Sequence, residues 1–253
     1  MTRRPRRPTC VLPALVCFAI VALGCTAAAQ QAEPRYQLWF SGGAQAAMPS
    51  LADRFTFEMH AEEASVEADH RATAALLVDG GFAVRLRRAY GVGVSVSRFS
   101  GRGRAAVAAR IPNPFEFDRF REASGTASGL DHTELAYHLQ LRYSRAIGGR
   151  LRLLLSGGPT VFDVRRELLI DVQVDEAYPF DTATFRNASA RVAKGTGIGF
   201  HAGADLVWMA ARRAGVGALL RYARGTADLT AASRTLSVDT GGLQSGLGLR
   251  VYF

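Results

Sequence analysis

Ionisable residues that could work as acids, bases or ion pairs alternate with apolar residues along much of this chain. Arg250, for example, lies between Leu249 and Val251. In an extended strand successive side chains point to opposite faces, so the charges share one face and the apolar row the other. The residues that we expect together on the charged face are Asp79, Arg85, Glu134, Arg142, Asp205, Arg221 and Arg250.

Acids and arginines on one enclosed face have two chemical uses. They can pair and fill the space, or they can line a path for ions. An unpaired charge is costly to bury, so mutual pairing is the expected arrangement. We therefore predict a network of paired charges that plugs an interior, with a narrow ion path as the alternative.

Motifs of the common enzyme classes are missing from the sequence. The glycines of Lys194–Gly199 (KGTGIG) do not form a Walker pattern, and no GxSxG elbow occurs. Cys10, Cys17 and Cys25 all fall in the first 30 residues, so the rest of the chain has no cysteine that could act as a nucleophile or bind a metal. We therefore expect no catalytic residue, no cofactor and no metal site.

The elements that must position these residues are eight predicted β-strands, each with a period of two. Short turns alternate with long polar stretches between them, and 48–70, 112–131 and 178–194 are predicted as outer loops. The first of these stretches has a second interpretation, as strands that extend beyond a membrane. The predicted strands are 36–46, 72–86, 91–111, 132–144, 151–174, 195–209, 215–231 and 239–253.

The last of these strands is rich in glycine and carries Arg250 on one face. Its other face presents Leu243, Leu247, Leu249, Val251 and Phe253. A soluble barrel would keep the apolar row inside, but a crowded polar lumen suits glycine and arginine better. The pattern therefore favours a transmembrane β-barrel with apolar residues outside, and a soluble secreted barrel is the alternative.

Residues 1–29 have the pattern of a signal peptide. Four arginines precede an apolar run, Val11–Gly24, and small residues follow at 27–29. Removing these four arginines lowers the formal net charge from +9 to +5. For an exported basic chain, anionic lipid is a more natural partner than nucleic acid. We assign 1–29 to the signal peptide and 30–253 to one barrel domain.

In architecture the mature chain resembles the small outer-membrane β-barrel family of OmpA/OmpX and opacity-protein-like type. The marks of this resemblance are the signal peptide, eight amphipathic strands and the terminal row. The fold it implies is all-β, an eight-stranded antiparallel up-and-down barrel in a Gram-negative outer membrane. It also implies a signal for the barrel-assembly machinery, formed by Phe253, Val251, Leu249 and Leu247.

Two further sets of residues follow from a membrane location. Aromatic residues are expected at the membrane boundaries, and Trp39, Tyr143, Trp208 and Tyr222 are the predicted girdle. Exposed arginines suit phosphate and carboxylate equally well. Contacts with lipopolysaccharide are therefore one hypothesis, and pairing with the acidic first loop is the other, for Arg98, Arg102, Arg104 and Arg110.

Three functions follow from this pattern. The first is a non-enzymatic envelope protein, monomeric, that acts through its long outer loops while charges plug its lumen. The second is a narrow porin-like channel for ions or small solutes. The third is a lipid-modifying barrel enzyme, and here no histidine is followed by serine in the His-x-Ser spacing of such hydrolases.

Overall fold

A computed structural model describes residues 34–46, 50–231 and 234–253. The predicted signal peptide, 1–29, and its cleavage site lie outside the described residues. Residues 34–253 form one compact unit. Among the described residues, no helix has the length and apolarity needed to cross a membrane.

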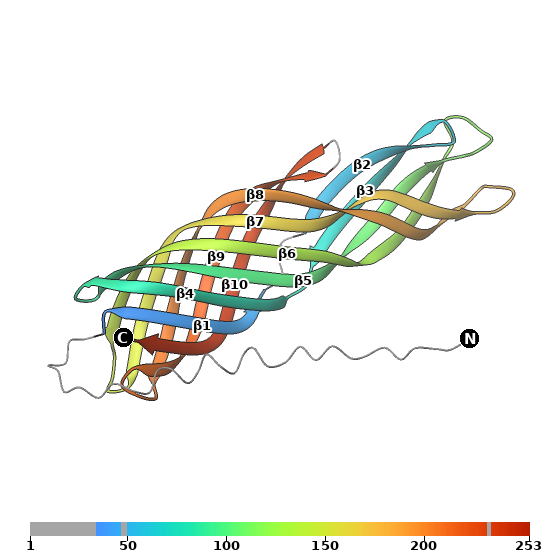
Figure 1. Cartoon of the computed structure of the whole chain (residues 1–253). Helices are drawn as coiled ribbons and strands as arrows, with labels where there is room; N and C mark the ends of the chain where they lie inside the picture. The colour runs from blue at the N-terminus through green and yellow to red at the C-terminus, as the bar shows by residue number, and fades with distance from the viewer. Residues whose placement is uncertain (1–33, 47–49, 232–233) are drawn as a thin grey trace, which may run out of the picture. The chain divides into compact units, whose positions relative to one another are not determined.

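The described residues of this unit form ten antiparallel strands (Figure 1). They are β1 (Tyr36–Gln45), β2 (Leu51–Met59), β3 (Glu62–Ala72), β4 (Ala75–Arg87), β5 (Tyr90–Pro112), β6 (Phe120–Ala146), β7 (Leu151–Glu176), β8 (Ala183–Met209), β9 (Ala214–Ala231) and β10 (Arg234–Tyr252).

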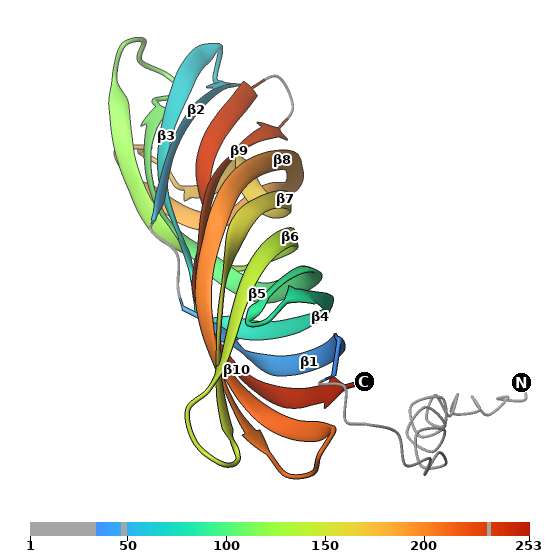
Figure 2. The ribbon, with the colours of Figure 1, turned by 90° about the vertical axis from the view of Figure 1, so that its left-hand side faces the viewer.

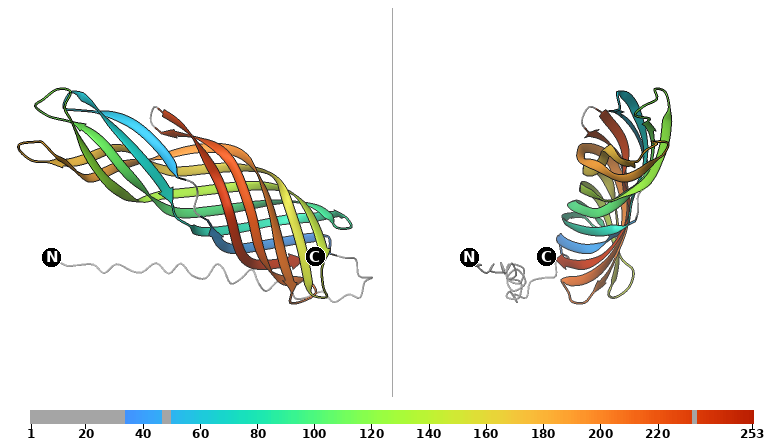
Figure 3. Two further views of the ribbon diagram at one scale, coloured as in Figure 1. Left: turned by 180° about the vertical axis from the view of Figure 1, so that it is seen from behind. Right: turned by 90° about the vertical axis from the view of Figure 1, so that its right-hand side faces the viewer.

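Eight positions in the sheet close into a ring. The strand order is β2-β3-β5-β4-β1-β10-β9-β8-β7-β6, and a further pairing of β5 with β6 closes it. β4 pairs with residues 90–100 of β5, and β3 pairs with residues 103–110 of the same strand. β3 and β4 therefore share one position in the wall, with the β2–β3 hairpin beyond the ends of β1 and β4 (Figures 1 and 3). The predicted eight-stranded meander barrel is confirmed.

Alternation along β5 shows why these sequences form the wall of a membrane barrel. Val92, Val94 and Val96 are exposed on the outside, while Ser95 and Ser97 are buried inside. Similar apolar rows cover the outside of all eight wall positions. Lipid solvates such a surface and cannot solvate backbone groups, which the closed ring pairs. The band from Tyr90 to Val96 is the part of β5 that suits a bilayer.

The polarity of the wall reverses beyond this band. On the same strand β5, Val107 and Ile111 are buried inside, whereas Arg102 and Arg104 are exposed outside. Side chains from β2, β3, β6, β7 and β8 join this apolar interior, among them Phe55, Val66, Leu169 and Val172. The outer part of the barrel is therefore built like a water-soluble β-protein, with an ordinary hydrophobic core.

Most of the sequence predicted as long outer loops is strand, which corrects that prediction. The stretch 48–70 contains β2 and most of β3, and β6 and β8 begin at Phe120 and Ala183, well inside the other two stretches. The second interpretation of 48–70, extended strands, is the correct one. A two-residue turn with positive φ, at His60 (54°) and Ala61 (61°), joins β2 to β3.

The outer core generates a test of this fold. Replacing Val107 by Asn buries an amide without partners and removes an apolar side chain, at a cost of about 2–4 kcal/mol. The matched control is Ala108→Asn, because Ala108 is the next residue and points outward. Urea unfolding in detergent micelles measures both variants. Equal stability of the two proteins would mean that the outer part is not packed as described.

Candidate functional site

Arg250 is the most enclosed charge in the lumen, with 0% of its surface exposed. Its Nε donates a hydrogen bond to Asp205 Oδ2 (2.6 Å), and its Nη2 donates one to Asp205 Oδ1 (3.1 Å). A Cβ at position 217 would lie 2.7 Å from Arg250 Nε, so Gly217 leaves the space that this pair occupies. A bidentate pair with this geometry compensates for the loss of water around both charges.

Asp79 and Arg221 form the second buried pair. Arg221 Nη1 donates to Asp79 Oδ2 (2.9 Å), and only 1% of Asp79 and 2% of Arg221 is exposed. The Nε of Arg221 continues the network, whereas its Nη2 has no hydrogen-bond partner among the described residues. Arg221 Nε donates to Gln244 (2.6 Å), and Gln244 Nε2 donates to Gln45 (2.7 Å). The pair thus belongs to a continuous polar layer that links β4, β9, β10 and β1 inside the lumen. Figure 2 shows the strands that carry it.

Trp39 lies inside the lumen and not in the outer girdle, which corrects that prediction. Its indole Nε1 donates to Asp79 Oδ1 (2.9 Å), and the Arg142 guanidinium stands 4.3 Å from its ring centroid. The period of two already placed Trp39 opposite Leu38 and Phe40, which point outward. An indole can be buried here because its N–H has an acceptor and its ring face has a cation.

The remaining members of the predicted charge network lie at other heights along the barrel. Glu134 is buried, and it accepts hydrogen bonds from His132 Nε2 (2.9 Å) and from the backbone N–H of Gly241 (3.3 Å). Arg85 is half-buried near the turn between β4 and β5. The structure therefore joins Asp79 to Arg221 and Asp205 to Arg250, and it gives Glu134 and Arg142 a histidine and a tryptophan instead.

Two histidines that the sequence pattern places on the inward face, His138 and His201, form a layer in the lumen. Ser97 Oγ is hydrogen-bonded to His138 Nε2 (2.9 Å), and Thr160 Oγ1 lies 2.8 Å from His138 Nδ1 and 2.9 Å from His201 Nδ1. The centroids of the two imidazole rings are 4.6 Å apart, and the ring planes meet at 69°. Their strand parity was visible in the sequence, but the contact between β6 and β8 across the lumen was not.

Aromatic residues do mark the outside of the barrel. Trp208 and Tyr222 are exposed, and Tyr143 packs against Tyr90 with ring centroids 5.3 Å apart. A further aromatic cluster was not predicted from the sequence. The Tyr36 ring lies 5.9 Å from the Phe82 ring and 6.1 Å from the Phe253 ring, measured between centroids. These residues come from β1, β4 and the C-terminus, so only ring closure brings them together.

The proposed assembly signal lies on the outer surface. Leu247, Leu249, Val251 and Phe253 are all exposed on the lipid-facing side of the closing strand. The backbone of Phe253 is held in the sheet, because its N–H donates to Tyr36 O (3.0 Å) and its oxygen accepts from Tyr36 N–H (2.7 Å). The role of this row in assembly stays a prediction.

The four predicted phosphate-binding arginines are exposed on the outside of β5, beyond the apolar band. Arg102 lies 3.5 Å from Asp131, and Arg110 stacks 4.7 Å from the Phe120 ring centroid. Acidic residues of the β2–β3 hairpin pair with other arginines, for instance Glu67 with Arg54 and Asp69 with Arg71. Within the described residues, pairing of the four arginines with this acidic hairpin is thus not seen.

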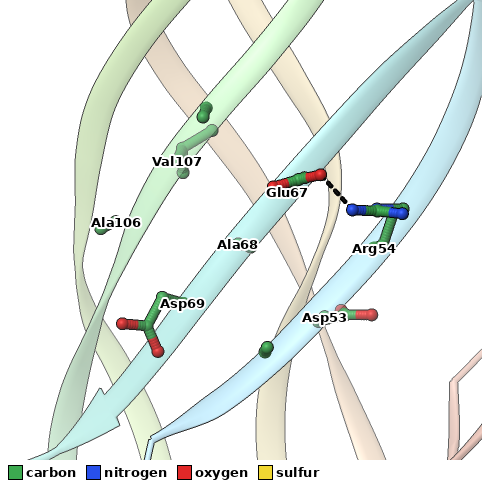
Figure 4. Close-up of a pocket in the computed structure, with 9 residues that line it drawn as sticks. Asp53, Arg54, Glu67, Ala68, Asp69, Ala106 and Val107 are labelled. Atoms are coloured by element: carbon green, nitrogen blue, oxygen red, sulfur yellow. Dashed lines mark hydrogen bonds and ion pairs between the residues drawn. The ribbon is translucent and has the colours of Figure 1, made fainter.

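A hollow of about 420 Å³ lies against β2, β3 and β5 (Figure 4). Its charged lining residues have ionic neighbours: Arg54 with Glu67, Asp69 with Arg71, and Asp53 at 4.0 Å from His70. Figure 4 shows Arg54 and Glu67 turned toward each other across the two strands. Because these groups are already engaged, the hollow offers little for a charged ligand.

Comparisons with solved structures return outer-membrane proteins. Neisserial surface protein A is 11% identical, with a TM-score of 0.43, over 86% of this chain and 96% of that one. OprG from Pseudomonas aeruginosa is 13% identical, with a TM-score of 0.42, over 87% and 97%. The protease OmpT from Escherichia coli is 9% identical, with a TM-score of 0.49, over 87% and 97%.

No family model and no curated protein matches the sequence. The TM-scores of the three structures are below 0.5, and it is the closed ring with its outward apolar band that identifies the fold. The chain has the fold of a small outer-membrane β-barrel. That fold hosts several kinds of activity, and the function must be argued from the side chains.

The buried pair of Arg250 and Asp205 should contribute strongly to stability. Asp205→Asn leaves the arginine buried without its countercharge, and the free energy of unfolding should fall by about 3–5 kcal/mol. The control is Asp239→Asn, because Asp239 pairs with Arg224 on the exposed surface and should matter little. Urea unfolding in lipid vesicles measures both. A double variant, Asp205→Asn with Arg250→Gln, should recover part of the loss, and a loss no larger than that of the control would contradict the pairing.

Proposed function

We propose that this protein is a closed, non-enzymatic barrel of the bacterial outer membrane. Its role is in envelope structure or in contacts at the cell surface, made by the part of the barrel beyond the bilayer. The apolar band around all wall positions supports the location. The outer part supports the role, because its packed core gives a stable surface in place of the long loops expected from the sequence.

The observation that carries this proposal is the filling of the lumen. Arg250, Asp79 and Arg221 are each at most 2% exposed. Arg250 donates to the Asp205 carboxylate, and Arg221 donates to the Asp79 carboxylate and to the Gln244 amide. An eight-stranded barrel has an interior that side chains can just fill. Apolar side chains of Leu154, Val207 and Tyr252 add a plug near the ends of β7 and β8. A wide aqueous path does not fit this interior.

Lipopolysaccharide phosphate is the surface ligand that we propose for the outer arginines. Arg98 lies at the edge of the apolar band, since its strand neighbours are Val78 and Leu135. Farther out, Arg104 stands directly opposite Arg71. Like charges at opposed positions of a sheet repel each other. Asp69 compensates the charge of Arg71, and a bound phosphate would do the same for Arg104. The barrel-assembly machinery, acting on the row that ends at Phe253, is the partner proposed for biogenesis.

Planar-bilayer recordings test the closed lumen against the channel alternative. The purified protein should show no stable discrete openings, because its lumen is packed with paired charges. A variant that combines Arg250→Ala with Asp205→Ala removes both side chains of the most enclosed pair and should leak. Heat-modifiable gel mobility establishes that each protein is folded. Reproducible openings in the unaltered protein would favour the channel instead.

Binding of lipopolysaccharide tests the surface contact. Replacing Arg98, Arg102, Arg104 and Arg110 together by Gln should weaken binding by roughly tenfold or more, because charge-assisted hydrogen bonds to phosphate are lost. The control variant carries Gln at Arg54, Arg165 and Arg186, which are exposed arginines with acidic partners. Dephosphorylated lipopolysaccharide should bind both proteins equally weakly. The idea fails if the control variant loses as much affinity as the test variant.

A further inference from the structure

The wall of the barrel has a seam in its outer half. Pairing between β1 and β10 ends at Gln45 and Gln244. Beyond this point β10 continues outward to Arg234 with ladder partners on β9, and β2 has ladder partners on β3. Two strand edges therefore face each other without a ladder between them in the described part of the chain. Figures 1 and 2 show β2 beside the red outer ends of β9 and β10.

A cavity of about 290 Å³ lies in this seam. Its lining combines hydroxyl groups, three apolar side chains, one carboxylate and one buried cation, contributed by both edges, by β9 and by β7. The lining residues are Ser50, Leu51, Ala52, Arg166, Thr226, Ser237, Val238 and Asp239. A volume near 300 Å³ is at the small end of the range for small-molecule pockets.

The buried cation is Arg166, which is 6% exposed and comes from β7. The structure records no hydrogen bond or ion pair for its guanidinium among the described residues. Its strand partner is His132, and the nearby carboxylate of Glu134 is occupied. One oxygen of Glu134 accepts from His132 and the other from Gly241 N–H. Burial lowers the pKa of Arg166, and the charge of Glu134 opposes that effect.

An arginine stays protonated at neutral pH, so a positive charge lies at the inner end of the cavity. Among the described residues no carboxylate forms an ion pair with it, and Glu134 acts on it only from farther away. The acid on the cavity's rim does not supply a counter-ion, because Asp239 pairs with Arg224 at 3.3 Å. Planar guanidinium groups favour carboxylate and phosphate oxygens. The site is thus suited to a small anionic group that enters through the seam.

The position of the seam along the barrel, relative to the lipid-facing rows, suggests the source of this anion. On β9, Tyr222 belongs to the exposed lipid-facing row, and Thr226 on the same face lines the cavity. On β10, Leu243 is exposed to lipid and Asp239 lies four residues farther out. The cavity therefore opens at the boundary between lipid and water. Leu51 and Val238 in its wall can contact the first carbons of an acyl chain.

We propose that this seam is a binding site for the phosphate or carboxylate group of a small anionic amphiphile, with the Arg166 guanidinium as its counter-ion. The ligand enters sideways between β2 and β10, without passing through the plugged lumen. This site is separate from the arginines on the outer face of β5.

Calorimetric titration of the full-length protein in maltoside micelles tests the site, with dihexanoyl phosphatidic acid as the probe. Saturable binding is expected, and Arg166→Gln should weaken it by roughly tenfold or more, the effect of losing a charge-assisted hydrogen bond. The matched control is Arg165→Gln, because Arg165 is the neighbouring residue and points outward. A second variant, Leu51→Trp, fills the cavity without altering its charge and should also weaken binding. Heat-modifiable mobility establishes that all variants are folded.

Two further probes separate the possible ligands. Inorganic phosphate that binds as tightly as the amphiphile would identify a free anion as the source, and binding of the amphiphile alone would identify a lipid. Either result supports an anion site at Arg166. Three results would overturn it: no saturable binding by the folded protein, equal affinity in Arg166→Gln, or equal binding of zwitterionic dihexanoyl phosphatidylcholine.

Discussion

Backbone hydrogen bonding in lipid is the constraint on which this structure depends. A hydrocarbon environment offers no partner for N–H or C=O groups, so every strand edge inside the bilayer must be paired. The chain satisfies this requirement by joining its first and last strands, β1 and β10, from Gln37 opposite Tyr252 to Gln45 opposite Gln244. The reciprocal bonds between Tyr36 and Phe253 complete the ring at its end.

Closure with apolar residues outside forces the polar residues into a narrow interior. There each charge must find a partner, because water is excluded and an isolated charge is expensive. Arg250 with Asp205 and Arg221 with Asp79 meet this condition by direct pairing. Arg142 meets it with the ring face of Trp39. The packing that stabilises the lumen is thus also the physical basis of the proposed closure.

Beyond the bilayer the constraint is relaxed, and the structure changes accordingly. Water can pair with free backbone groups there, so β2 and β10 can leave their facing edges without a ladder. Water also reverses the preferred polarity, and the wall turns arginines outward and Val107 and Ile111 inward. On β5 this reversal of polarity begins at Arg98, which points outward, and Phe99, which points inward. The exposed arginines and the cavity at Arg166 are both consequences of this transition.

The sequence by itself determined the class of fold, the lipid-facing rows and which charges point inward, because side-chain parity in a strand is a local property. The alternation along β1 also places Trp39 on the inward face, although the girdle hypothesis placed it on the outside. Only the tertiary structure decided that the predicted loops are strands, since their pattern of alanine, valine and charge matches an apolar interior. It alone decided that Asp79 meets Arg221 and that Arg166 has no ion pair within the described part of the chain, because such contacts depend on the register between distant strands.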